Sequence, residues 1–145
     1  MNNKETVVRD LTPEEAYTWL AKIMPGCHND ELEKIIATDA YWACEYAVNV
    51  IKGRFELAEQ VIAKNPIWSY YYARYAIKGR FELAEQVIAK NPIWSYYYAR
   101  EVIKGRFKLG EPAIATDAYY AYWYAREVIK GRFELAEQVI AKNPI

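Results

Sequence analysis

A glutamate recurs at one position of the sequence, 26 residues apart, as Glu33, Glu59, Glu85, Glu111 and Glu137. Paired carboxylates are common general acids and bases, which makes proton transfer the first chemistry to consider. No other catalytic residue type accompanies these glutamates, and copies one repeat apart would be separated by a whole helix-packing step. A carboxylate in every copy predicts a structural ladder instead. Its partner would be the arginine of a KGR tripeptide or an arginine of a neighbouring helix.

The histidine and cysteine content argues against the common nucleophilic and metal chemistries. His28 is the only histidine and follows Cys27, so any Ser-His-Asp or Cys-His arrangement would have to include it. With Cys44, these residues offer at most three metal ligands and lack the paired spacing of zinc sites. The KGRF segment is typical of a helix terminus, not of a phosphate-binding loop. We therefore expect no enzyme activity, no cofactor and no metal site.

A period of 26 residues dominates the chain, and residues 51–74 are identical to residues 77–100. Such a period indicates a repeat array, in which each unit buries its apolar face against its neighbours. We predict a single domain over 1–145 with a partial sixth unit at 143–145. The five full units are expected at about 13–38, 39–64, 65–90, 91–116 and 117–142.

Each unit is predicted to form two short helices. Asn65 stands at a helix N-cap with Pro66 at the first helical position, and Gly79 is expected to end that helix in the left-handed conformation. The second helix, about 80–90, carries apolar residues on one face. Helices this short need neighbours to stabilise them. The expected fold is therefore an all-α solenoid, with a diverged and more polar N-terminal capping unit.

The aromatic residues divide into two sets by their helical register. We expect Trp68, Trp94 and Tyr120 to pack between units, on the same side as Tyr72. A second set lies off this stripe and would form a ladder of rings and guanidinium groups that contacts a partner, because Tyr, Trp and Arg dominate binding hot spots. The alternative is that these rings cover the second helix of an adjacent unit. The predicted ladder is Tyr70, Tyr71, Arg74, Tyr96, Tyr97, Arg100, Tyr122, Trp123 and Arg126.

The composition favours a cytoplasmic protein. Lys+Arg and Asp+Glu number 19 each, so no net charge attracts the chain to nucleic acid or to an anionic membrane. No apolar run approaches the roughly 18 residues of a membrane-spanning helix, and the polar start of the chain lacks a signal-peptide core. We expect no membrane association.

The pattern YAR-x-V-IKGRF-x-L-x-E, at 98–111 and 124–137, resembles short helical repeats of predicted proteins from tailed bacteriophages and some bacteria. The resemblance covers about 39–145 and weakens over 1–38. It implies a helical repeat fold, a phage origin and no catalytic activity. Small phage proteins often bind host proteins, so it also implies an inhibitor of a host defence or nuclease protein, acting in the host cytoplasm. A consensus-designed array is the alternative origin.

Two classes of function stay open. The leading hypothesis is a non-enzymatic helical repeat that binds a protein through one face. The alternative is a binder of nucleotides or single-stranded nucleic acid, in which the ladder of tyrosines and arginines grips bases and phosphates. The zero net charge makes nucleic acid the less favoured partner, because phosphate contacts supply most non-specific affinity.

The end of the sequence suggests self-association. Residues 143–145 begin another unit, and repeat arrays normally close with a capping unit whose outer face is polar. The fifth unit would then expose its stacking surface, and a two-fold dimer would cover that surface on both chains. We expect a homodimer through Tyr124, Val128, Phe133 and Val139.

Overall fold

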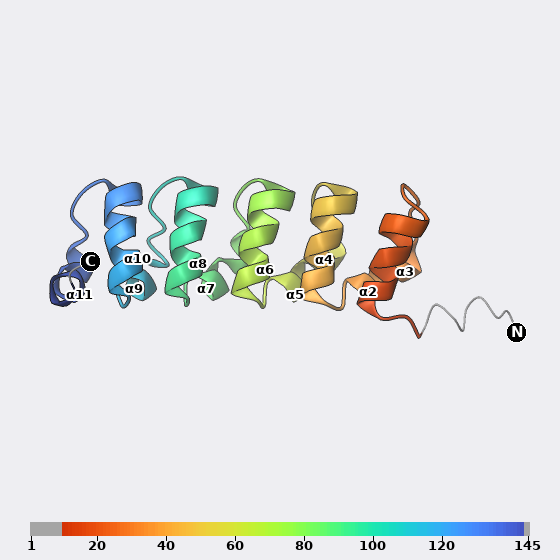
Figure 1. Cartoon of the computed structure of the whole chain (residues 1–145), viewed down its shortest axis with the longest axis horizontal. Helices are drawn as coiled ribbons and strands as arrows, with labels where there is room; N and C mark the ends of the chain where they lie inside the picture. Colours follow the sequence, from red (N-terminus) through yellow and green to blue (C-terminus); the bar gives the residue numbers. More distant parts are fainter. Residues whose placement is uncertain (1–9, 144–145) are drawn as a thin grey trace, which may run out of the picture.

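The computed structural model describes residues 10–143, and this part of the chain folds into helices joined by short loops, without a strand. Pairs of helices follow one another in tandem (Figure 1). The first helices of the pairs stand side by side in one row, and the second helices run along that row. The α-helices are α2 (Pro13–Thr18), α3 (Asp30–Ile36), α4 (Ala40–Tyr46), α5 (Glu59–Ile62), α6 (Pro66–Tyr71), α7 (Glu85–Ile88), α8 (Pro92–Tyr97), α9 (Glu111–Ile114), α10 (Ala118–Trp123) and α11 (Glu137–Lys142).

The predicted all-helical tandem packing is confirmed, although the helices are wound less regularly than expected. Each first helix continues past its α-helical part as a π-helix, and three second helices begin with a 3₁₀ turn. The π-helices are Trp19–Ile23, Ala47–Ile51, Tyr72–Ile77, Tyr98–Ile103 and Tyr124–Ile129, and the 3₁₀ turns are Glu56–Ala58, Glu82–Ala84 and Glu134–Ala136. No helix within residues 10–143 is both long enough and apolar enough to cross a membrane.

The first helices begin where the sequence predicts. The side chain of Asn91 accepts hydrogen bonds from the backbone N–H groups of Ile93 and Trp94 and so satisfies two of the free donors at the start of α8. Thr12 forms the predicted capping box with Glu15 at the start of α2. Asp39, Asn65 and Asp117 cap the remaining first helices in the same way.

The first helices end differently from the prediction. In the four KGR copies the left-handed residue is the lysine, with φ of 56–57°, and the following glycine is not left-handed. The N–H groups of Lys104 and Gly105 both donate to the carbonyl of Ala99, which closes the π-helix. The expectation that Gly79 occupies the left-handed position is wrong because the extra residue in the π turn moves that position to Lys78. A left-handed L-residue costs roughly 1–2 kcal/mol.

A set of buried hydrogen bonds joins each unit to the next, and we call this set a relay. The hydroxyl of Tyr98, in the fourth unit, donates to Glu85 Oε1 of the third unit over 2.9 Å. The same hydroxyl accepts from the Phe81 N–H at 2.8 Å, and Arg80 donates to both oxygens of Glu85. Tyr98 is fully buried, and its ring packs edge-on against the Phe107 ring of its own unit. Equivalent relays are Tyr72 with Glu59, Phe55 and Arg54, and Tyr124 with Glu111, Phe107 and Arg106.

Removing one relay hydroxyl should destabilise the array without creating a cavity. Tyr98→Phe leaves the buried Phe81 N–H without an acceptor and removes one of the three donors to the Glu85 carboxylate, so we expect a loss of about 1–3 kcal/mol in the free energy of unfolding. Tyr71→Phe is the matched control, because Tyr71 is exposed and its hydroxyl forms no hydrogen bond within the described chain. Urea unfolding measures both variants. Equal effects of the two substitutions would contradict the relay.

Candidate interaction surface

The repeated glutamates are held as ionised structural groups. Glu85 accepts two hydrogen bonds from Arg80 and one from Tyr98, and the Arg80 guanidinium lowers the pKa of this carboxyl below its ordinary value. Arg106 lowers the pKa of Glu111 in the same way. The predicted pairing with the KGR arginines is therefore confirmed. A carboxylate surrounded by donors in this way holds no proton to give and has little basicity to offer.

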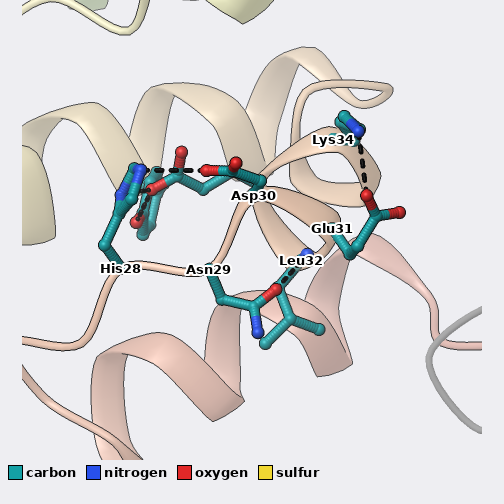
Figure 2. Close-up of polar contacts among 8 residues, drawn as sticks. His28, Asn29, Asp30, Glu31, Leu32 and Lys34 are labelled. Atoms are coloured by element: carbon teal, nitrogen blue, oxygen red, sulfur yellow. Dashed lines mark hydrogen bonds and ion pairs between the residues drawn. The ribbon is translucent and has the colours of Figure 1, made fainter. Parts of the chain in front are cut away.

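The first unit uses a histidine for the same purpose, and Figure 2 shows His28 facing Asp30. His28 occupies the place of the KGR arginine, and its Nδ1 lies 2.7 Å from Glu33 Oε1. Its Nε2 lies 3.0 Å from Asp30 Oδ1. Tyr46 completes the relay by donating its hydroxyl to Glu33 at 2.7 Å. Glu33 thus receives one donor from the histidine where the other units receive a two-donor fork from arginine.

His28, Asp30 and Glu33 are the one group of side chains within residues 10–143 whose geometry could surround a metal ion, with ligand atoms within 4.8 Å of one another. Both imidazole nitrogens face a carboxylate oxygen of this group. Its position matches the arginine pairs of the other units. The absence of a metal site stays a prediction.

A continuous aromatic surface runs along the first helices α4, α6, α8 and α10, which stand in one row (Figure 1). Successive ring centroids lie 4.9–6.3 Å apart across three unit boundaries. Each ring is exposed or half-buried, so one flank packs in the array and the other meets solvent. We call this surface the aromatic face, and it consists of Tyr41, Trp68, Tyr71, Trp94, Tyr97, Tyr119, Tyr120 and Trp123.

The predicted ladder falls only in part on this face. Tyr70 and Tyr96 are 3% and 4% exposed, so their assignment to a partner surface is wrong. Their rings pack against the first helix of the next unit, where Tyr70 contacts Trp94 and Tyr96 contacts Tyr120. Of the other predicted rings, Tyr71 is exposed, and Tyr97, Tyr122 and Trp123 are half-buried.

Two arginines of the ladder form ion pairs across unit boundaries. Arg74 Nη2 lies 3.2 Å from Glu101 Oε2, and Arg100 Nε lies 3.1 Å from Glu127 Oε2. Arg126 stacks on an aromatic ring instead and forms no ion pair within residues 10–143. In the third and fourth units the positive charge of the ladder is therefore already balanced by glutamates.

Trp68, Trp94 and Tyr120 contact aromatic rings of the preceding unit, as predicted. They are only half-buried, which places them at the border between the core and the aromatic face. The structure adds exposed residues that the sequence reasoning missed. Tyr41, Tyr75 and Tyr119 are among them, and an exposed leucine recurs in the second to fifth units as Leu57, Leu83, Leu109 and Leu135. The 26-residue spacing of these leucines was the available signal.

The predicted self-association patch is wrong for two of its four residues. Tyr124 is 0% exposed and Phe133 is 3% exposed, because their rings pack together and the Tyr124 hydroxyl is bound within the relay. Val128 and Val139 are half-buried. A homodimer stays a prediction, without Tyr124 and Phe133 as its contacts.

A shallow groove of about 200 Å³ lies in the aromatic face between α8 and α10. It is lined by Tyr96, Tyr97, Arg100, Tyr119, Trp123 and Glu127. The indole N–H of Trp123 is buried and has no acceptor within the described chain. An apolar groove with a charged pair at its edge suits an inserted side chain more than a substrate that must be activated.

No protein-family model matches this chain, and comparisons with curated proteins and with solved structures also gave no match.

The relays should make stability depend on pH at both extremes. The pKa of Glu85 and Glu111 is lowered from 4.5 in the folded chain, so their stabilisation is complete above that value and is lost as pH falls through the folded value. Burial raises the pKa of Tyr72, Tyr98 and Tyr124 from 10.0, so their contribution is complete below pH 10.0 and is lost as pH rises through the folded value. Urea unfolding should show a broad maximum at about pH 5–9. Constant stability down to pH 3 would contradict the glutamate assignment.

The first unit should gain stability from arginine at position 28. His28→Arg supplies a two-donor fork to Glu33, whereas the imidazole offers it one nitrogen. We expect slower amide exchange over residues 30–36, by about 0.5–1 kcal/mol in protection. Lys22→Arg, an exposed cation substitution in the same unit, is the control. Equal protection gains from the two substitutions would show that the effect does not come from the contact with Glu33.

Proposed function

We propose that this tandem array is an α-solenoid that acts as a non-enzymatic binding protein, and that the aromatic face receives a protein partner. The observation that supports this most directly is the unbroken run of partly exposed rings from Tyr41 to Trp123. Tyrosine and tryptophan bury a large area at a small cost in side-chain entropy, and they are enriched among binding hot spots.

The rings are held in place before any partner arrives. Tyr71, for example, contacts Trp68 and Tyr75 on its own helix and Trp94 on the next, so its position is set from several sides. A surface that is already ordered loses little conformational entropy on binding. The exposure of aromatic side chains to water is unfavourable, and a large exposed apolar patch usually marks an interaction site. The exposed rings therefore favour a role as a contact surface.

A protein partner is favoured over a nucleotide or a single strand. Aromatic rings beside arginines hold single strands only when the arginines are free to neutralise phosphates. Arg74 and Arg100 are engaged by Glu101 and Glu127 at 3.1–3.2 Å, so a phosphate would have to displace a carboxylate in each unit. The resemblance to phage repeat proteins makes a bacterial host protein the class of partner to test first.

Truncation of exposed rings should weaken partner binding and leave the fold intact. Tyr71→Ala with Tyr119→Ala removes two exposed rings that take no part in the relays, and we expect binding weaker by about 1–3 kcal/mol. The control is Leu83→Ala with Leu135→Ala, which trims exposed apolar side chains on the second helices. Immobilised protein first captures partners from bacterial lysate, and titration calorimetry with the identified partner then compares the variants.

Either of two results would contradict the proposal. If the leucine pair weakens binding as much as the tyrosine pair, the contact surface lies on the second helices. If the captured partner is a nucleic acid whose affinity falls steeply with salt, phosphate contacts dominate and the alternative function holds.

A further inference from the structure

A row of lysines follows one edge of the array, separate from the aromatic face. We call it the lysine edge, and it consists of Lys52, Lys78, Lys104 and Lys130. All four are exposed and stand at the same position, where the first helix ends and the loop to the second helix begins. These loops line up along one edge of the row of first helices (Figure 1).

The backbone at these lysines is in a conformation that glycine would adopt with less strain. Each lysine has φ of 56–57°, and the glycine of the same KGR tripeptide stands one residue later with an ordinary φ. A positive charge near a helix C-terminus is favourable, but a residue in the last helical turn supplies it without strain, as Arg100 does. A lysine at a strained backbone position, where glycine would cost less, is a reason to look for a function of the lysine side chain.

The ammonium groups of the lysine edge are not neutralised within the described chain. None of the four forms an ion pair or a hydrogen bond within residues 10–143. The KGR arginines beside them are different, because each is bound to a glutamate of its own unit. The lysines therefore present one ammonium group without an ion pair in each of the second to fifth units, with an exposed glutamate four residues later in the second, third and fifth units.

The charge is most concentrated between the fourth and fifth units. A groove of about 310 Å³ there is lined by Arg100, Lys104, Gly105, Glu127, Val128 and Lys130. Arg100 and Glu127 are paired with each other, so Lys104 and Lys130 determine the net charge of this groove. Lys108 adds to it, because this position is a glutamate in the second, third and fifth units.

We propose that the lysine edge binds an acidic peptide segment that runs along the array in an extended conformation. Neighbouring helices pack about 8–10 Å apart, and an extended chain advances about 3.3 Å per residue, so a carboxylate at every third residue would meet one lysine per unit. A phosphate backbone is a poorer match, because its charges are more closely spaced than the lysines. The segment could belong to the partner of the aromatic face, but the proposal uses different residues.

The probe is a fluorescein-labelled peptide of twelve residues with glutamate at every third position, and an otherwise identical glutamine peptide is its control. Fluorescence anisotropy at low salt should show binding of the glutamate peptide at least tenfold tighter than of the glutamine peptide. The difference should shrink as salt is raised, because salt screens exposed charges.

The deciding variant is Lys78→Gly with Lys104→Gly. Glycine relieves the left-handed strain, so we expect a melting temperature equal to or above that of the original chain, together with at least fivefold weaker peptide binding. Lys64→Gln with Lys90→Gln removes the same charge from exposed lysines at the C-terminal ends of second helices, and it should change the affinity less than twofold.

Several outcomes would overturn the proposal. A glycine variant that unfolds at a lower temperature would show that the lysines serve the fold. Equal weakening by the two double variants would show general attraction to a charged chain and no defined edge. A twelve-nucleotide single strand that binds more tightly than the glutamate peptide at the same salt would assign the edge to nucleic acid.

Discussion

The buried tyrosine–glutamate hydrogen bond between units is the interaction on which the rest of this structure depends. Helices of four to seven residues do not persist alone, and the relay fixes each second helix to the following first helix at a polar point inside an apolar interface. Because Glu85 is held by Arg80 and by Tyr98 together, loss of Arg80 would leave a buried carboxylate without its cation, and loss of Tyr98 would remove the bond to the next unit. The relay therefore sets the orientation of successive first helices, and through it the line of the aromatic face.

The two surfaces follow from this orientation for different reasons. The aromatic face arises because adjacent first helices bury one flank of each ring and leave the other in solvent. The lysine edge arises from the π-helical ends, which place a left-handed residue at the same point of four units. One surface is mainly apolar, with Arg74 and Arg100 paired to Glu101 and Glu127, and the other carries lysines that form no ion pair within the described chain. They suit partners, or parts of a partner, with different chemistry.

Features whose causes lie close together in the sequence could be predicted, whereas features that depend on packing between units could not. The caps at Asn65 and Asn91 and the pairing of Glu85 with a KGR arginine follow from short-range patterns, and both were predicted correctly. The left-handed position at Lys104 was missed, because π winding shifts the helix end by one residue and leaves no signature beside a glycine. The burial of Tyr70 was also missed. A first helix in this array packs against a first helix on each side, so it buries two flanks, whereas the helical register indicated one stripe.

The interfaces between units are chemically alike, and this has an evolutionary consequence. Glu59 meets Tyr72 with the same chemistry that Glu85 uses for Tyr98, and residues 51–74 repeat unchanged at 77–100. If a block such as 65–90 were lost by recombination, Glu59 would face Tyr98 and the junction would be chemically identical to the one it replaced. The number of repeat units can thus change without creating a new kind of interface. Each unit gained or lost lengthens or shortens the aromatic face and the lysine edge by one unit.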